Sequence, residues 1–264
     1  MHISGKHLLI LIAAVILICA IMSAGCIGNI SPLPNEVKIK GNIISVDEQY
    51  IEPNTILDML FYPNEFYKEL FDAVDVYLPP EEPVIELGIG SGALAAYVNR
   101  LLETKGDHVG VEPNPHLMPL LEKTKETNVL GVKLSGYAVA YGKDTVPMKF
   151  SRNLLDSGIT PNQERDTINV PAATVKKLIN EYDFQQEDNI TLITEYSGAA
   201  ADIFTNEPTI RSAVKTVITG EWDISPEDIA ILIRKAGNAG YRLTHESETG
   251  ADGLKVFVFT RIEN

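Results

Sequence analysis

The sequence predicts one α/β domain built on a mostly parallel β-sheet that ends in an antiparallel hairpin. Three observations support this fold class. Short apolar runs typical of buried strands alternate with longer segments of helical periodicity. The first of these strands runs directly into a cluster of glycines that opens a helix. The last two strand-like runs follow one another with no helix between them.

The first half of the domain alternates strands with helices. Three strand-like runs and the two helical segments between them are, in chain order, Val84–Leu87, Ala93–Glu103, His108–Glu112, Pro115–Lys125 and Val132–Ala140. A helix over Pro63–Leu78 is expected before the first strand, because its apolar residues recur at helical spacing and Pro79 stops the pattern. Since β-α-β connections join parallel strands by right-handed crossovers, this half predicts a parallel sheet.

The second half continues the alternation and closes with the hairpin. Its three expected helices and two expected strands are, in chain order, Ala173–Glu181, Ile190–Thr194, Ala199–Phe204, Val214–Glu221 and Pro226–Ala239. The final runs, Tyr241–Glu246 and Lys255–Arg261, are joined by a polar stretch that contains two glycines. They therefore predict a β-hairpin.

Composition limits the classes of function. The chain has 264 residues, 45% of them hydrophobic, which allows one domain with a substantial core and an N-terminal appendage. The formal net charge is −14 and no stripe of Lys and Arg offsets it, so nucleic acid is a poor candidate partner. Both cysteines, Cys19 and Cys26, lie in the N-terminal segment, and the five histidines are scattered. We therefore expect no disulfide and no metal site in the domain.

Residues 1–26 have the organisation of a secretory signal. Lys6 precedes an apolar run over Leu8–Met22, and small residues lead into Cys26. The tetrapeptide Ser23–Cys26 resembles a lipobox, in which the cysteine becomes a lipidated N-terminus, although Ser23 replaces the usual leucine. The alternative is that Cys26 ends an uncleaved anchor helix. In both cases we expect a membrane-anchored protein whose domain lies on the extracytoplasmic face, because the positive charge precedes the apolar run.

Between this segment and the domain the sequence predicts a tether. Residues 27–45 contain two prolines and several asparagines and have little apolar periodicity. We therefore assign residues 27–45 to the tether and residues 46–264 to the folded domain.

The residues after the first strand of the domain predict a cofactor site. Glu86 stands near the strand end and is followed by Gly88, Gly90 and Gly92, which allow a ligand to approach the backbone closely. This loop fits the amino-acid half of S-adenosylmethionine, whose ammonium group the carboxylate would engage. Glu112 ends the next strand, where a carboxylate can accept hydrogen bonds from both ribose hydroxyls. The alternatives are a purely structural glycine turn and a solvated strand-end acid.

NAD is a second candidate cofactor. Gly88, Gly90 and Ala93 also satisfy the G-x-G-x-x-G/A pattern of dinucleotide sites, with Glu112 as the ribose acid. The terminal hairpin argues against NAD, because an antiparallel hairpin after parallel β-α units is typical of class I methyltransferases.

Several stretches together resemble the FkbM family of S-adenosylmethionine-dependent methyltransferases, over approximately Pro79–Ile262. The matching stretches are Val84–Leu94, His108–Pro115, Ile168–Pro171, Ile224–Ile229 and Ala236–Tyr241. The resemblance implies a Rossmann-like class I methyltransferase fold with a seven-stranded sheet. It also implies methyl transfer to oxygen, commonly of a sugar or natural-product hydroxyl. By position, the residues expected to bind the cofactor are Glu86, Gly88, Gly90, Gly92 and Glu112, with Tyr137 and Ala138 bordering the adenine.

The chain departs from the family after the strand at Ile190–Thr194. Members usually carry an Asp-Ile/Val-Glu-Gly motif there, with another acid soon after. Here the first acid is retained as Glu195, whereas Ser197 and Ala200 occupy the other two positions. Glu195 is therefore the one candidate for the base that removes the acceptor proton, and its alternative is a structural strand-end acid. Trp222 replaces a family histidine and is expected to pack or to form a pocket wall.

Two functions follow from these observations. The first is an S-adenosylmethionine-dependent methyltransferase of FkbM type that acts on a hydroxyl of a glycan or small molecule. The second is a non-catalytic, membrane-anchored surface lipoprotein that retains the fold. The depleted acidic motif and the export signal favour the second, since the cofactor is made in the cytoplasm. The glycine loop and Glu112 favour the first, because a structural domain has no evident need for both.

Overall fold

The computed structural model describes residues 33–153, 157–159, 167–184, 189–207 and 210–263. The chain divides into two compact units, Met1–Pro34 and Asn35–Asn264, and the fold below is that of the second. The expected signal over residues 1–26 and the expected lipidation site Cys26 lie outside the described residues. Within the described part of the chain, no helix has the length and apolar character needed to span a membrane.

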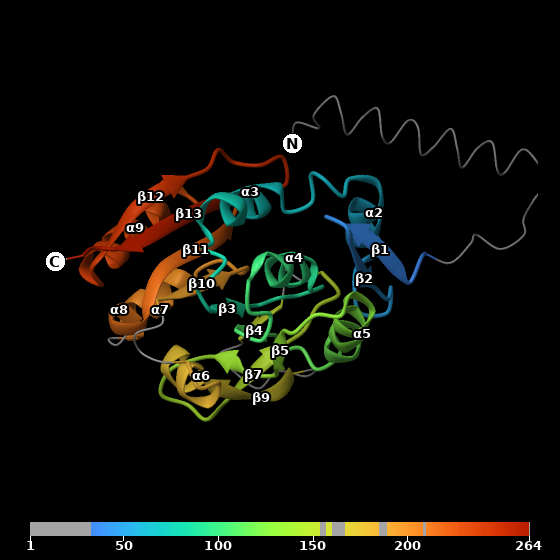
Figure 1. Ribbon diagram of the computed structural model, residues 1–264, viewed down its shortest axis with the longest axis horizontal. Helices are drawn as coiled ribbons and strands as arrows, with labels where there is room; N and C mark the ends of the chain where they lie inside the picture. Colours follow the sequence, from blue (N-terminus) through green and yellow to red (C-terminus); the bar gives the residue numbers. More distant parts are fainter. Residues whose placement is uncertain (1–32, 154–156, 160–166, 185–188, 208–209, 264) are drawn as a thin grey trace, which may run out of the picture. The chain divides into compact units, whose positions relative to one another are not determined.

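A seven-stranded sheet forms the centre of this unit (Figure 1). Its strands, in chain order, are β3 (Val84–Leu87), β4 (His108–Val111), β5 (Lys133–Ser135), β10 (Ile190–Thr194), β11 (Val214–Trp222), β12 (Tyr241–Glu246) and β13 (Leu254–Arg261). The spatial order is β12-β13-β11-β10-β3-β4-β5. All neighbouring strands are parallel except β13, which is antiparallel to β11 and β12. The predicted α/β class, seven-stranded sheet and terminal hairpin are confirmed.

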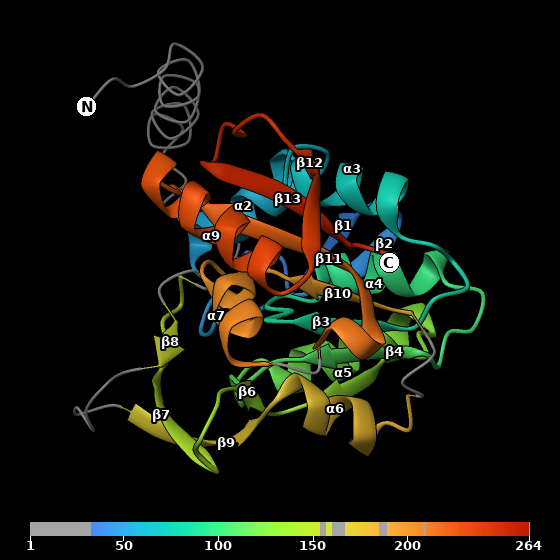
Figure 2. The same cartoon turned by 90° about the vertical axis from the view of Figure 1, so that its left-hand side faces the viewer.

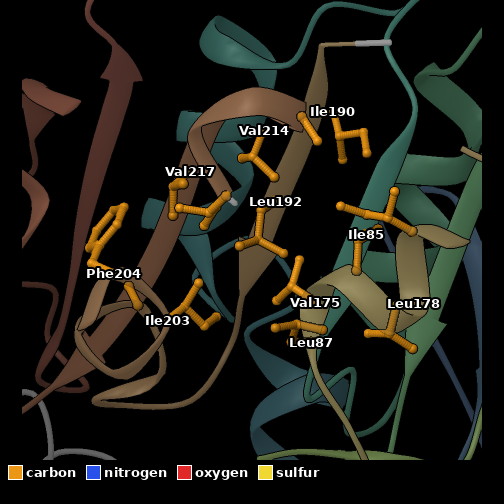
Figure 3. Close-up of a cluster of buried hydrophobic side chains, with 14 of the residues drawn as sticks. Ile85, Leu87, Val175, Leu178, Ile190, Leu192, Ile203, Phe204, Val214 and Val217 are labelled. Carbon is orange, nitrogen blue, oxygen red and sulfur yellow. The ribbon is translucent and has the colours of Figure 1, made fainter. Parts of the chain in front are cut away.

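Helices cover both faces of the sheet. One face packs against α6 (Val175–Glu181), α7 (Ala199–Asn206) and α9 (Pro226–Asn238), which share one apolar core with the strands. Figure 3 shows this core, where Ile85 and Leu87 of β3 lie near Leu178 of α6. The other helices of the unit are α2 (Pro53–Phe61), α3 (Lys68–Tyr77), α4 (Ala93–Leu101), α5 (Met118–Asn128) and the short α8 (Ile210–Ala213). Of these, α3 packs on β11 and β13, and α4 packs between α3 and α5.

Local sequence sets where several helices begin. Ser225 caps α9, since its hydroxyl accepts a hydrogen bond from the Asp228 N–H (3.1 Å) and Pro226 occupies the first turn. Helix α3 starts at Lys68 and not at Pro63 as predicted, because Tyr67 adopts a left-handed conformation with φ 53°.

A second, four-stranded sheet was not predicted. Its strands are β6 (Ala138–Val139), β7 (Thr145–Lys149), β8 (Gly158–Ile159) and β9 (Thr167–Ala173), in the order β6-β9-β7-β8. Figure 2 shows β7, β8 and β9 apart from the seven-stranded sheet. The run Val132–Ala140, predicted as one strand, is therefore divided: its first part is β5 and its last part is β6, with Gly136 between them.

Part of the segment predicted as a tether is folded. Residues 36–45, assigned to it from sequence, form a hairpin of β1 (Glu36–Ile39) and β2 (Asn42–Ser45). Lys40 and Gly41 both have positive φ, as a tight two-residue hairpin turn requires. The hairpin packs on α5, where Asn128 Oδ1 accepts from the Ile43 N–H at 2.9 Å. Each strand has only four residues, which is too short for a pattern of alternation to stand out in the sequence.

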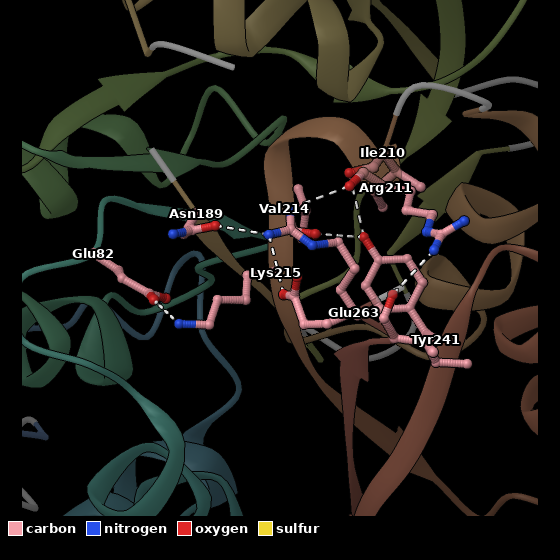
Figure 4. A network of polar contacts seen from close by, with 10 residues as sticks. Glu82, Asn189, Ile210, Arg211, Val214, Lys215, Tyr241 and Glu263 are labelled. Atoms are coloured by element: carbon pink, nitrogen blue, oxygen red, sulfur yellow. Dashed lines mark hydrogen bonds and ion pairs between the residues drawn. The ribbon is translucent and has the colours of Figure 1, made fainter. Parts of the chain in front are cut away.

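Polar contacts fix the amino ends of the strands (Figure 4). The Tyr241 hydroxyl donates to the carbonyl oxygen of Val214 at 2.6 Å, where β11 begins. Lys215 forms an ion pair with the nearly buried Glu82 (2.6 Å), just before β3. These contacts hold the amino ends of the strands. The candidate site lies at the opposite, carboxyl ends.

Candidate active site

The carboxyl ends of the parallel strands open into a cavity of about 630 Å³. This is where ligands bind in open α/β sheets, and the volume lies within the range of small-molecule sites. Segments that follow four adjacent strands line it. In spatial order they contribute Glu112 and Asn114 after β4, Gly88 and Gly90 after β3, Glu195, Tyr196 and Ser197 after β10, and Trp222 and Asp223 at the end of β11.

The loop between β3 and α4 requires its glycines. Gly88, Gly90 and Gly92 all have positive φ, at 77°, 49° and 78°. A Cβ atom on Gly88 would lie 2.7 Å from the ring of Tyr196, and one on Gly92 would lie 2.6 Å from Leu121. The glycines therefore let the loop pack closely against Tyr196 and Leu121, and the Gly88 and Gly90 backbone forms part of the cavity wall.

Glu112 is held firmly at the cavity wall. Its two carboxylate oxygens accept hydrogen bonds from the backbone N–H groups of Gly90 (2.9 Å) and Asn114 (2.8 Å). Only 6% of the residue is exposed. Burial raises the pKa of Glu112 to about 7, although the two backbone hydrogen bonds oppose this shift. Each oxygen can accept one further hydrogen bond, so the carboxylate can still bind a pair of ligand hydroxyls.

Glu86 lies behind the wall of the cavity and does not line it. Its side chain is fully buried, and its Oε2 lies 2.9 Å from Nε2 of the equally buried His108. The parallel register explains the contact: Glu86 is opposite Gly110, which has no side chain, and His108 is two residues earlier on the same face of β4. Glu86 was expected to bind the ammonium group of the cofactor. The structure instead places its side chain behind the cavity wall.

Neighbouring backbone groups determine the tautomer of His108. Asn99 Oδ1 accepts from the Gly131 N–H (3.0 Å), and its Nδ2 donates to the carbonyl oxygen of Lys105 (2.8 Å), which fixes the amide orientation. Nδ2 of Asn99 also faces His108 Nδ1 at 3.4 Å, so this ring nitrogen is the acceptor. His108 Nε2 therefore carries the hydrogen and donates it to Glu86.

Glu86 and Glu195 form a buried carboxyl pair. Oε1 of each is buried and has no hydrogen-bond donor among the described residues. Burial is the main cause that raises the pKa of Glu195 well above its usual value, followed by the charge of Glu86 and a hydrogen bond with it. Two carboxyl groups in contact must share a proton. Since the pKa of Glu195 is the one that is raised, the proton of the pair resides on Glu195, which lines the cavity.

The second sheet supplies an apolar wall. Tyr137 and Ala138, expected from the resemblance to border an adenine, both line the cavity immediately after β5. This wall is extended by Met148 of β7, by Phe150, which follows β7, and by Ile159 of β8. The ammonium group of Lys177 lies 4.4 Å from the centre of the Tyr137 ring, on which it packs as a cation over an aromatic face.

The far end of the cavity is aromatic. The rings of Tyr67 and Trp222 have their centres 5.6 Å apart, and Phe66 stacks on Tyr67 at 4.3 Å. Ser197, one of the two positions where the family has an acid, accepts a hydrogen bond from the Trp222 N–H at 2.8 Å. The other position, Ala200, lies in the first turn of α7 and is fully buried in the core. Sequence reasoning missed Tyr67 and Tyr196, since no local motif marks either.

The described residues contain no cluster of three or more His, Cys, Asp and Glu side chains that could hold a metal ion.

Comparisons with known proteins give a fold and no family. No family model matches the chain, and no curated protein matches it. SMU.776, assigned as a methyltransferase and complexed with SAH, aligns with a TM-score of 0.52 at 9% identity, over 88% of this chain and 57% of that one. M. jannaschii TYW2 in complex with AdoMet aligns at 0.48 and 14% identity, over 89% and 90% of the two chains. The ribosomal protein L11 methylase from Lactobacillus delbrueckii subsp. bulgaricus aligns at 0.48 and 11%, over 75% and 78%.

At such identities a structural match establishes the fold alone. None of these matches supports the FkbM family specifically. The strand order, the antiparallel last strand and the match to SMU.776 agree on one architecture. The unit Asn35–Asn264 therefore has the Rossmann-like fold of class I methyltransferases.

Proposed function

We propose that the protein is an S-adenosylmethionine-dependent methyltransferase that transfers the methyl group to a hydroxyl of a glycan or other small molecule. The observation that carries the proposal is the cradle formed by the glycine loop and Glu112. The Gly90 N–H orients the Glu112 carboxylate beside the loop, at the edge of the sheet where this fold binds ligands. SMU.776 and TYW2, which share the fold, were solved with SAH and AdoMet. The FkbM-like stretches support oxygen as the receiving atom.

The residues present fit the cofactor. Glu112 retains hydrogen-bonding capacity for ribose hydroxyls, and the glycines expose backbone groups for the amino-acid half. Tyr137 and Ala138 offer a flat apolar surface for the adenine. When bound, S-adenosylmethionine supplies an electrophilic methyl group on a positively charged sulfur.

Glu195 is suited to accept the proton of the acceptor hydroxyl. It lines the cavity beside Gly88, since β10 pairs with β3. It must first release the proton that it shares with Glu86. A cation bound in the cavity favours that release, because positive charge stabilises the ionised carboxyl.

Replacing Glu112 by Ala is expected to weaken the binding of S-adenosylmethionine and of SAH by about ten-fold or more, since hydrogen bonds to a charged acceptor are lost. Calorimetry on the full chain at pH 8 measures both affinities. Glu126→Ala, which removes an exposed carboxylate from α5, is the matched control and should bind like the parent.

An unchanged affinity in a folded Glu112→Ala protein would contradict the assignment. Binding of NAD in place of S-adenosylmethionine by the parent would overturn the proposed cofactor.

A non-catalytic, membrane-anchored surface lipoprotein is the second candidate function. The lipobox-like Ser23–Cys26 and the loss of acids at Ser197 and Ala200 favour it. The membrane anchor and the extracytoplasmic location are proposals common to both functions.

The lipid anchor has a direct test. Intact-mass analysis of the membrane fraction is expected to give a product that begins at Cys26 and carries lipid mass, because cleavage before this residue exposes it for modification. Cys26→Ser should abolish the product. An uncleaved N-terminus without lipid mass in the parent protein would refute lipidation and favour an anchor helix.

A further inference from the structure

We infer that the acceptor, which bears the methylated hydroxyl, is a small cation in which an amine is attached to an aromatic or apolar body. The inference rests on the proposed function and specifies the chemistry that the acceptor half of the same cavity recognises. Four features carry it: the order of the strands, the charges of the wall, the aromatic pair and the apolar surface of the second sheet.

The strand order separates the cofactor half of the cavity from the acceptor half. Gly88, Gly90 and Glu112 follow β3 and β4, and they form the cradle assigned to the cofactor. On the other side of β3 lie β10 and then β11. Glu195 and Asp223 follow these two strands, so the remaining space lies on their side of the cradle.

The part of the cavity wall that the structure describes is acidic and contains no basic side chain. Among the described residues that line it, Glu112, Glu195 and Asp223 are acidic and none is Lys, Arg or His. The pair of Glu195 and Glu86 keeps one negative charge even while it shares a proton. Burial, followed by the charges of Glu195, Asp252 and Glu112, raises the pKa of Tyr67. The negative field therefore extends to the aromatic end of the cavity.

Aromatic faces occupy the same end. Trp222 and Tyr67 both line the cavity, with ring centres 5.6 Å apart and planes inclined at 58°. An ammonium group is attracted to the faces of such rings, and Trp is the strongest of the aromatic partners. Phe66 stacks on Tyr67 and holds its ring in place. Carboxylates beside aromatic faces form an environment that favours a cation over a neutral group.

The second sheet gives the cavity an apolar wall, which selects the body of the acceptor. Met148, Phe150 and Ile159 line the cavity from the second sheet. A hydrocarbon or aromatic ring can bury its surface here. A carboxylate or phosphate would instead lose hydration beside Glu195 and Asp223 without gaining a basic partner among the described lining residues. The geometry therefore disfavours acidic sugars and phosphorylated acceptors.

The test uses the full chain saturated with SAH and a series of three probes that differ in charge: phenethylamine, 2-phenylethanol and 3-phenylpropionate. Trp222 is the only tryptophan of the chain, so its fluorescence reports on this end of the cavity directly. At pH 7.5 we expect phenethylamine to bind at least ten-fold more tightly than 2-phenylethanol, and 3-phenylpropionate to bind most weakly.

Two variants locate the preference. Asp223→Asn removes a charge, and Glu195→Gln removes the carboxyl group that a bound cation would ionise, both at nearly constant shape. Asn also tolerates the positive φ of residue 223 (50°). Each variant should lower the affinity for phenethylamine. We expect about a ten-fold loss for the buried Glu195 and about a three-fold loss for the exposed Asp223. The affinity for 2-phenylethanol should stay nearly unchanged in both variants. Glu126→Gln, an exposed substitution on α5, should alter neither.

The outcomes separate the inference from the proposed function. Equal or tighter binding of the alcohol, tight binding of the carboxylate, or binding of none of the three probes to SAH-loaded protein would overturn the inference. So would an amine preference that survives both variants. Loss of SAH binding by the parent protein would instead contradict the proposed function, and with it the inference that rests on it.

Discussion

Replacing Glu195 by Gln is expected to lower the rate of methyl transfer by about 10²–10⁴-fold, the usual contribution of a positioned base. The affinity for SAH should change little, because Glu112 and the glycine loop form the cofactor cradle. Gln preserves the size of the side chain but cannot take a proton at neutral pH. Its amide can still donate a hydrogen bond to Glu86, so the packing of the buried pair is retained.

The measurement is transfer of labelled methyl groups to a panel of acceptors that bear a hydroxyl, including phenols, sugars and hydroxylated amines such as tyramine. Glu126→Gln is the control for handling and folding. Undiminished turnover in Glu195→Gln would eliminate Glu195 as the base and leave catalysis by positioning alone. A parent protein that binds SAH but methylates none of the panel would favour the non-catalytic function. An acid could then be restored at Ser197, but not at Ala200, because the core there is closed.

The fold could be predicted where burial sets the pattern. Strands β3, β10 and β12 have the predicted bounds, because each is a continuous apolar run or an alternating one next to turn residues. The second sheet lacks such a signal. Its strands β7 and β9 contain Pro147 and Pro171, and proline argues against a strand in any reading of the sequence alone.

The cofactor cradle could be predicted because its parts are local. The glycines and Glu112 each directly follow a recognisable strand. The pairing of Glu86, Glu195 and His108 could not, since it depends on which residues of three neighbouring strands share one face. The register that sets Glu86 between Ile193 and Gly110 exists only after the sheet has formed.

The buried glutamates also predict that the ligand-free protein loses stability as the pH rises. The pKa of Glu112 is about 7 in the folded chain, against an ordinary value of 4.5 for a solvated Glu side chain. Between these values the folded state retains a proton that the unfolded state has lost. The free energy of unfolding therefore falls with rising pH across this window, by about 3 kcal/mol in total. The raised pKa of Glu195 extends the loss to higher pH.

Thermal unfolding between pH 5 and pH 8 tests this expectation. For a domain of this size, about 3 kcal/mol corresponds to a decrease in Tm of about 5–10 °C. Glu112→Gln should flatten the dependence, although its midpoint is lower throughout, because the amide cannot accept from both the Gly90 and Asn114 N–H groups. The slopes are therefore compared, and not the absolute values. A Glu112→Gln protein with the slope of the parent would assign the pH dependence to other groups.

SAH connects this pH dependence to the site. If ribose hydroxyls donate to Glu112, they favour its ionised form and lower its pKa in the complex. Binding then releases a proton at pH 6, whereas at pH 8 the proton is already absent. SAH should consequently bind more tightly, and raise Tm further, at pH 8 than at pH 6. In Glu112→Gln this difference should largely disappear, while Glu126→Gln should retain it. An SAH-induced shift in Tm that is the same at both pH values in the parent protein would mean that the ligand does not engage the Glu112 carboxylate.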